Sequence, residues 1–158
     1  KKITKLSLKR DDKIKDQMHK ISRALVNYCY SNQIGTIIVG YNSGWKQDSN
    51  LGKINNQNFV SIPYYKLINM IEYKAQSLGI DVVKTTEAYT SKCSALDNED
   101  ICKHDTYLGS RICRGLFRTN NGTIINADVN GAYNIFRKYT DLIVTADAAT
   151  VPIKYNVI

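Results

Sequence analysis

The sequence predicts an α/β fold in which parallel strands are joined by a crossover helix. Short β-branched runs alternate with segments of helical periodicity, in the order helix, strand, helix, strand, helix. Two parallel strands need a long connection between them, and that connection usually contains a helix. The chain has 158 residues, which is enough for one ordinary domain.

The first predicted element is an amphipathic helix over residues 11–30. Its apolar residues are spaced four and three apart, which places them on one stripe of the helix. They are Ile14, Met18, Ile21, Leu25 and Tyr28. The lysines and arginines of this segment lie mostly off the stripe, so one side of the helix is predicted to be basic.

A buried strand is predicted at residues 36–40, where the run Thr-Ile-Ile-Val-Gly ends in a glycine. Residues 41–61 are rich in Asn, Gly, Gln and Ser and predict a long loop. Pro63 suits the first turn of a second helix, and Gly79 suits its end. The apolar side of this helix is predicted to contain Leu67, Ile71, Ala75 and Leu78.

A second strand is predicted at residues 80–85, and it leads to Glu87. Residues 90–126 are polar and irregular, with a hairpin-like turn at Asn120-Asn121-Gly122. A last helix opens at Asn126-Ala127-Asp128, and we expect no regular structure after Tyr139. Its buried side is predicted to contain Val129, Ala132, Ile135, Phe136 and Tyr139.

The composition is that of a globular protein with a basic segment. Hydrophobic residues make up 43% of the chain, which argues against a disordered protein, and no run of eighteen apolar residues predicts a membrane span. Residues 1–30 hold nine Lys or Arg and three Asp or Glu, whereas the whole chain has a net charge of +8. Such a segment suits a polyanionic partner, although a solvated helix face explains the charge equally well.

Four cysteines are present, namely Cys29, Cys93, Cys102 and Cys113, and none forms a C-x-x-C pair. We therefore expect reduced thiols and a cytoplasmic protein rather than a disulfide framework. The chain begins at Lys1 and not at Met, so we expect it to be part of a longer protein.

Two acidic residues are candidates for metal chemistry. Glu87 directly follows a predicted strand, and ligands of α/β sheets gather beyond the carboxyl ends of the strands. Asp128 stands at the start of the last helix. Carboxylate oxygens suit Mg²⁺, and carboxylate-bound metal ions suit phosphodiester hydrolysis. The alternatives are that Asp128 is only a helix N-cap and that Glu87 is an ordinary exposed carboxylate.

Several blocks of the sequence resemble the transposon-encoded TnpB (OrfB) nucleases. One contains Glu-Ala-Tyr-Thr-Ser-Lys-Cys-Ser, and another contains Asn-Ala-Asp-Val-Asn-Gly-Ala-Tyr-Asn-Ile. The blocks are residues 39–47, 50–53, 55–63, 87–94 and 125–135. They occur in the order of the family and cover roughly residues 10–139. The resemblance implies an RNA-guided DNA endonuclease with an RNase H-like fold of the RuvC type, related to type V CRISPR effectors.

The same resemblance implies that Glu87 and Asp128 are the second and third of three catalytic carboxylates that bind Mg²⁺ or Mn²⁺. The first would lie on a strand before the basic helix, in a Gly-Ile-Asp-like motif that this chain does not contain. We therefore expect an incomplete RuvC-type fold, and we expect the isolated chain to be inactive.

The family often carries a zinc ribbon with two C-x-x-C pairs between the second and third motifs. Here Cys93 matches one ligand, while Leu96, Arg118 and Asn121 occupy the other three positions. We therefore expect an insert without zinc. We expect apolar residues to hold it together, namely Leu116, Phe117, Ile124 and Ile125. An unusual site made of Cys93, Cys102, His104 and Cys113 remains an alternative.

The expected organisation has five parts: residues 1–30 as a basic helix segment of the nuclease domain, 31–89 as a RuvC-like core, 90–126 as the degenerate zinc-ribbon-like insert, 127–139 as the final RuvC-like helix, and 140–158 as a tail. Basic side chains are candidate contacts to the nucleic-acid backbone. They are Lys9, Arg10, Lys13, Lys15, Lys20, Arg23, Lys46, Lys53, Arg111, Arg114 and Arg118.

Three functions compete at this stage. The first is the carboxy-terminal nuclease portion of an RNA-guided DNA endonuclease, with DNA and a guide RNA as partners and a place beside the nucleoid of a prokaryotic cell. The second is an inactive nucleic-acid-binding remnant of such a protein, which the lost zinc ligands suggest. The third is a transposase or its accessory protein, for which the sequence has no separate signal.

Overall fold

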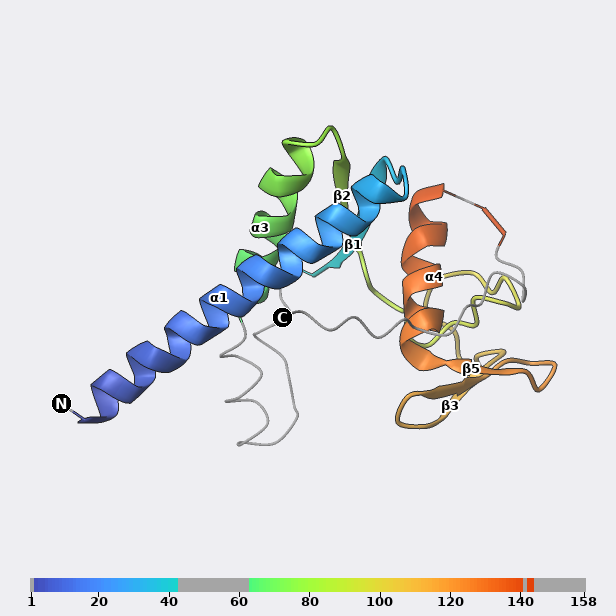
Figure 1. Ribbon diagram of the computed structural model, residues 1–158. Helices are drawn as coiled ribbons and strands as arrows, with labels where there is room; N and C mark the ends of the chain where they lie inside the picture. Colours follow the sequence, from blue (N-terminus) through green and yellow to red (C-terminus); the bar gives the residue numbers. More distant parts are fainter. Residues whose placement is uncertain (1, 43–62, 141, 144–158) are drawn as a thin grey trace. The chain divides into compact units, whose positions relative to one another are not determined.

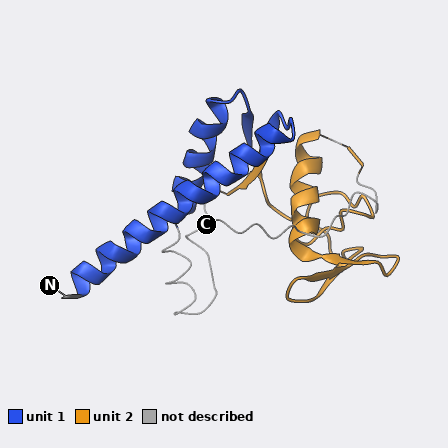
Figure 2. Ribbon diagram, viewed as in Figure 1, with its two compact units in different colours: residues 1–37, 44–83, 155–158 blue, residues 38–43, 84–154 orange. Residues whose placement is uncertain are grey.

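The computed structural model describes residues 2–42, 63–140 and 142–143. These residues form two compact units (Figure 2). Unit 1 contains residues 2–37 and 63–83, and unit 2 contains residues 38–42, 84–140 and 142–143. The predicted loop at 41–61 lies outside the described residues from residue 43 onward. So does most of the predicted tail.

Unit 1 is built on two helices, α1 (Lys2–Ser31) and α3 (Tyr64–Gln76). Helix α1 begins nine residues before the predicted start, because residues 2–10 contain good helix formers and neither Gly nor Pro. Its first turns are exposed and extend beyond α3 (Figure 1). Helix α3 begins directly after Pro63, as predicted, and the chain turns at Gly79, whose φ of +71° favours glycine.

The predicted buried stripe of α1 is wrong in part. Its buried residues are Met18, Ser22, Val26 and Cys29. By contrast, Ile21, Leu25 and Tyr28 are between 37% and 43% exposed. The helix is rotated relative to the prediction because Ser22 satisfies its hydroxyl within the helix, by donating to the Met18 carbonyl at 2.7 Å. That bond lets a polar residue lie against α3.

The core of unit 1 lies between the two helices and the start of the second strand. It consists of Val26, Cys29, Ile71, Ala75 and Ile80, with Ile37, Leu67, Leu78 and Val82 packed against it. The predicted apolar side of α3 is therefore confirmed. Lys74 was not predicted in this environment, yet it is only 4% exposed.

Two strands, β1 (Thr36–Tyr41) and β2 (Asp81–Thr86), pair in a two-stranded sheet, and the connection between them contains α3. The boundary between the units crosses both strands. Residues 36–39 are half-buried, whereas Gly40 is buried. The prediction of a fully buried strand is therefore wrong, because within the described residues β2 is the only strand that pairs with β1.

Unit 2 contains a small antiparallel sheet of β3 (Ser110–Cys113), β4 (Leu116–Arg118) and β5 (Ile124–Asn126). The expectation that residues 90–126 are irregular is therefore wrong in part. The predicted turn at residues 120–122 joins β4 to β5, and Gly122 has a φ of +87°. Of the apolar residues expected to support the insert, only Phe117 is buried. Leu116 and Ile124 are exposed, because neighbouring residues of a strand point to opposite faces. Ile125 is half-buried.

Helix α4 (Ala127–Thr140) closes unit 2, at the predicted place but with a different buried side. Ala127, Asn130 and Asn134 are its buried residues. Of the predicted set, Val129 and Ile135 are half-buried, and Ala132, Phe136 and Tyr139 are exposed. The two asparagines are buried because they bind backbone groups of residues 90–95. No helix in the described ranges is both long and apolar enough to cross a membrane.

Candidate active site

Glu87 lies one residue beyond the end of β2 and begins a tight turn. Its carbonyl accepts hydrogen bonds from the Thr90 amide at 3.2 Å and from the Thr90 hydroxyl at 2.8 Å. Tyr89, within the turn, has a φ of +64°. The Glu87 side chain is half-buried. The backbone at Glu87 is therefore held by hydrogen bonds within residues 87–90. The prediction that Glu87 directly follows a strand is confirmed, since β2 ends at Thr86.

Gly40 lets the strand β1 approach both Glu87 and α4. A Cβ atom on Gly40 would lie 3.1 Å from Glu87 Oε2 and 2.7 Å from Ile135 Cδ1. Because both atoms lie close to the same point, the side chains of Glu87 and of Ile135 in α4 are near each other beside the backbone of β1. The predictions included Gly40 only as the end of a strand, and its role depends on a contact that sequence reasoning missed.

Asp128 lies in the first turn of α4 and is exposed. The helix is capped by its neighbour, because Asn126 Oδ1 accepts hydrogen bonds from the amides of Asp128 at 2.8 Å and Val129 at 3.1 Å. The alternative that Asp128 is merely the N-cap is therefore wrong. Its carboxylate is left available for another role.

Asp128 and Ile135 are seven residues apart, which is about two helical turns or roughly 10 Å along the axis. At about 100° per residue, the two side chains lie on nearly the same face of α4. Glu87 therefore lies near the face of α4 that carries Asp128, but about two helical turns from Asp128 along the axis, so the observed contacts do not by themselves bring the two carboxylates together. Within the described part of the chain, neither carboxylate has a hydrogen bond or ion pair. That part also contains no group of three or more His, Cys, Asp or Glu residues placed to hold a metal ion.

Lys138 holds the backbone on both sides of Glu87. Its Nζ donates to the Thr86 carbonyl at 3.1 Å and to the Ala88 carbonyl at 2.7 Å. Burial lowers the pKa of Lys138 from its ordinary value, and the nearby Cys93 has a smaller, opposite effect. Sequence reasoning missed this contact, because Lys138 in the last turn of a helix is typical of a solvent-exposed residue.

Two buried asparagines of α4 bind the segment that follows Glu87. Asn134 Nδ2 donates to the carbonyls of Thr90 at 2.9 Å and Cys93 at 2.7 Å. Asn130 donates to the Cys93 carbonyl at 2.9 Å and accepts from the Ala95 amide at 2.9 Å. Together with Lys138, these side chains bind the backbone of residues 86–95 to α4. They therefore determine where Glu87 lies relative to this helix.

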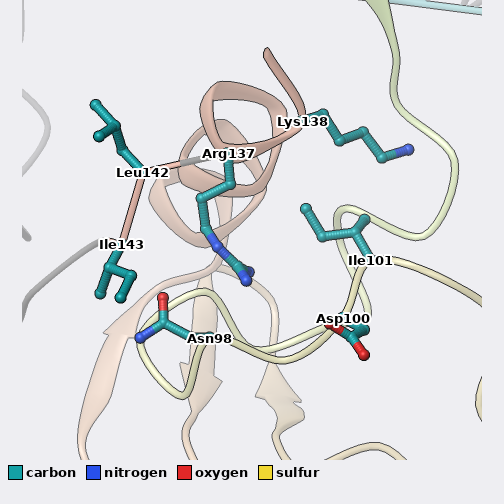
Figure 3. A pocket seen from close by; sticks show the side chains of 7 residues that line it. All are labelled: Asn98, Asp100, Ile101, Arg137, Lys138, Leu142 and Ile143. Atoms are coloured by element: carbon teal, nitrogen blue, oxygen red, sulfur yellow. The ribbon is translucent and has the colours of Figure 1, made fainter. Parts of the chain in front are cut away.

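A pocket of about 480 Å³ lies beside the carboxy-terminal end of α4 (Figure 3). The guanidinium of Arg137 points into it in the figure and is fixed by bonds from Nη1 to the Glu99 carbonyl at 3.0 Å and to Asn134 Oδ1 at 2.9 Å. Lys138 and Asp100 also line the pocket. Asn98 contributes a buried Oδ1 that has no hydrogen-bond partner in the described part of the chain.

The basic candidates on α1 are all exposed: Lys9, Arg10, Lys13, Lys15, Lys20 and Arg23. Two of them have acidic neighbours, since Arg10 pairs with Asp11 at 3.0 Å and Lys20 with Asp16 at 3.2 Å. Exposed pairs of this kind contribute little to stability. Lys46 and Lys53 lie outside the described residues.

The arginine candidates of unit 2 are also exposed, but they do not share one face. Arg111 is paired with Phe117, and Arg118 is paired with Ser110. Directly paired residues share a face of a sheet, and neighbours alternate. Arg111 and Arg118 therefore lie on opposite faces, with Arg114 in the turn between β3 and β4.

The cysteines of unit 2 do not converge. The buried Cys93 thiol points to the Cys102 carbonyl at 3.6 Å, while Cys102 Sγ lies 3.4 Å from His104 Nε2. Cys113 is exposed at the end of β3. Burial, and then the charge of Glu99, raise the pKa of Cys93.

Comparison with known proteins places this geometry in a family context. The model of the Cas12f1-like TNB domain matches residues 64–135. The CRISPR-associated endodeoxyribonuclease Cas12f1 of Sulfoacidibacillus thermotolerans is 33% identical over 119 residues, which are 74% of this chain and 25% of the relative. The TnpB-like protein ORF457 of Acidianus two-tailed virus is 35% identical over 82 residues, or 52% of this chain and 16% of the relative. The resemblance to the TnpB family is confirmed.

The CRISPR-associated endodeoxyribonuclease Cas12f2 of Micrarchaeota archaeon (strain CG1_02_47_40) is 31% identical over 129 residues, which are 76% of this chain and 23% of the relative. The chain thus spans a quarter or less of the curated relatives it matches. Among solved structures, a cryo-EM structure of Cas12f1 with sgRNA and target DNA matches with a TM-score of 0.62 and 23% identity. That match covers 85% of this chain and 36% of the other, and it shows a shared mixed α/β fold.

Proposed function

We propose that this chain is the nuclease portion of an RNA-guided DNA endonuclease that hydrolyses phosphodiester bonds with Mg²⁺ or Mn²⁺. The observation that carries the proposal is the approach of the Glu87 carboxylate to Gly40 and α4, beyond the end of β2. The confirmed resemblance to TnpB supports it, because the family's motif assigns catalytic roles to Glu87 and Asp128. We further propose that the fold is part of an RNase H-like domain of the RuvC type.

The chemistry of the donors fits a hard divalent cation. Glu87 and Asp128 offer carboxylate oxygens that are not used elsewhere in the described residues, and Mg²⁺ binds such oxygens while keeping several waters. When bound, the ion would activate water and neutralise charge on the phosphate. The resemblance places a third carboxylate on a strand before the basic helix, and we propose that the full-length protein supplies it.

The chain's own residues position these donors. Thr90 and Lys138 hold the turn that presents Glu87. Asn126 caps α4 and so leaves the Asp128 carboxylate free to face a ligand. Gly40 leaves room for the Glu87 side chain to approach α4. The hydrogen bonds hold the backbone that carries each donor, and an ordered backbone is one part of the preorganisation that electrostatic catalysis needs.

Guide RNA and target DNA are the proposed partners, as in the Cas12f1 complex that shares the fold. The exposed basic residues of α1 supply sequence-independent contacts to phosphates, which position a strand without reading its bases. The arginines of unit 2 would contact different strands or different segments, because Arg111 and Arg118 lie on opposite faces of their sheet.

A nucleic-acid-binding remnant without activity is the second candidate function. The observation that favours it is the replacement of three zinc-ligand positions by Leu96, Arg118 and Asn121, which indicates that part of the family's pattern has been lost. This candidate predicts binding that weakens steeply with salt, and no cleavage.

The test is metal-dependent cleavage by the full-length parent protein with its guide RNA. Glu87→Gln and Asp128→Asn should each reduce cleavage by at least about a thousandfold while leaving DNA binding intact, because each removes a ligand of the ion that activates water. Asp105→Asn, a change at an exposed carboxylate of the same unit, is the matched control. Cleavage that persists in either site variant contradicts the assigned role. A parent that binds DNA but never cleaves it supports the remnant.

A further inference from the structure

We infer that the segment of residues 90–126 is held together by two carboxylates, Asp97 and Glu99, in the place where the fold family uses zinc. We call this pair the carboxylate clamp. The inference concerns how the segment folds, and it does not depend on the proposed nuclease activity.

The side chains of the segment do not fit a zinc ion. Leu96, Arg118 and Asn121 occupy three of the four positions that a zinc ribbon gives to cysteine. The remaining cysteine, Cys93, is buried and directs its thiol to the Cys102 carbonyl rather than to another sulfur. Tetrahedral zinc needs four converging ligands. In the described ranges of the chain, Cys, His, Asp and Glu residues do not gather in any group of three or more suited to a metal ion.

Glu99 forms the first half of the clamp. It is 5% exposed, and both of its oxygens accept bonds from backbone amides. Oε2 accepts from the Ser94 amide at 2.6 Å, and Oε1 accepts from the Leu108 amide at 2.8 Å. One carboxylate thus ties the residue after Cys93 to the chain just before β3. A buried carboxylate is costly unless it is satisfied in this way.

Asp97 forms the second half. Its Oδ2 accepts from the Ser94 hydroxyl at 2.5 Å and from the Asn120 amide at 2.8 Å. Ser94 follows the first position that matches a zinc ligand, and Asn120 lies between the two positions of the second pair. Asp97 therefore connects the two loops that a zinc ion would connect.

These bonds are suited to replace a metal. Hydrogen bonds to an ionised acceptor are shorter and roughly twice as strong as bonds between neutral groups. The clamp is also joined to α4, because Asn130 binds the Cys93 carbonyl and the Ala95 amide, and Arg137 binds the Glu99 carbonyl. The structure thus assigns to Asp97 and Glu99 the cross-linking role of a structural zinc.

The test measures amide hydrogen exchange and zinc content of the full 158-residue chain. The Ser94, Leu108 and Asn120 amides should be protected, and this protection should survive a strong zinc chelator. Asp97→Asn should speed exchange at Asn120, and Glu99→Gln at Ser94 or Leu108, by about tenfold or more. Asp105→Asn, at an exposed carboxylate of the same segment, should leave all three amides unchanged.

A variant that restores the missing cysteines provides a positive control for metal binding. The triple variant Leu96→Cys, Arg118→Cys, Asn121→Cys completes a four-cysteine set with Cys93, and Co²⁺ should then give the absorption bands of thiolate coordination. The unchanged chain should give none. Stoichiometric zinc in the purified chain would overturn the inference, as would loss of protection on chelation. Unaltered exchange at all three amides in both clamp variants would overturn it too, and a variant that fails to fold leaves the chelator and zinc measurements decisive.

Discussion

Glu87 lies so close to Gly40 that a methyl group on the glycine would press against its side chain. A Cβ atom there would be 3.1 Å from Glu87 Oε2 and 2.7 Å from a methyl carbon of Ile135. The first distance is tight, and the second is shorter than side-chain packing allows. Strand β1, the residue after β2 and helix α4 therefore come close together at the backbone of Gly40.

Gly40→Ala should displace the end of the Ile135 side chain and shift the Glu87 side chain. We expect the free energy of unfolding to fall by about 1 kcal/mol, at the low end for overpacking, because the crowded atoms belong to half-buried side chains that can move. In the full-length parent, cleavage should fall further than the loss of folded protein explains. Gly35→Ala is the control, since a Cβ at Gly35 would meet nothing within 4 Å. Equal unfolding midpoints for the two variants in urea would contradict the close contact.

Substitutions at Asn126 and at Asp128 should affect the stability of α4 to different extents, because only Asn126 caps the helix. Asn126→Ala removes the cap and should lower the free energy of unfolding by about 1 kcal/mol. Asp128→Asn should cost only a few tenths of a kcal/mol, which is the size of the favourable effect of a negative charge near a helix N-terminus. Thermal unfolding of both variants checks this. A larger loss for Asp128→Asn than for Asn126→Ala would restore a structural role for Asp128.

The order of the helices and of the first two strands could be predicted from the sequence, because local signals determine it, whereas strands β3, β4 and β5 lie in a segment that was expected to be irregular. Pro63 marks the start of α3, the turn at residues 120–122 joins β4 to β5, and the apolar run before Glu87 forms β2. Each of these signals depends on backbone preferences within a few residues, so no knowledge of distant contacts is needed.

The buried faces could not be predicted, since they depend on partners far along the chain. Asn130 and Asn134 are fully buried because carbonyls about forty residues earlier accept their amide protons. On α1, Ser22 rather than Ile21 lies against α3 for a similar reason, because its hydroxyl donates to the Met18 carbonyl and also accepts a bond from Lys74 of α3. Periodicity weighs hydrophobicity alone and therefore chooses the wrong face when buried polar groups are paired. The catalytic roles of Glu87 and Asp128 stay predictions from the family's motif.

Asn130→Asp tests the buried amide contacts of α4. The substitution removes the donor to the Cys93 carbonyl and places an additional acceptor beside it, at a position with no solvent exposure. We expect a loss of about 2–4 kcal/mol in the free energy of unfolding, because a buried polar group would lose its partner. Gly131→Ala, on the next residue, is the control and should be neutral or stabilising by up to about 1 kcal/mol. Urea unfolding distinguishes the two, and similar midpoints would contradict the assigned contacts.

Lys74 should make the stability of unit 1 depend on pH. Its Nζ donates to Ser22 Oγ at 2.6 Å and to the His19 carbonyl at 2.8 Å, and no carboxylate among the described residues forms an ion pair with it. Burial, and then the charge of Arg23, lower the pKa of Lys74 below its ordinary value of 10.5. Between the lowered pKa and 10.5 the unfolded chain binds more protons than the folded one, and stability therefore rises with pH in that window.

The measurement is urea unfolding of the wild-type chain and of Lys74→Met at several pH values from 7 to about 10, a range set by the ordinary lysine pKa. The difference between the two free energies of unfolding should shift in favour of the wild type as the pH rises, because deprotonation removes the cost of burying the charge. Lys66→Met, at an exposed lysine of the same helix, should show no such trend. A difference for Lys74→Met that is constant or moves in the opposite direction would show that the ammonium group is fully compensated by its two oxygen acceptors.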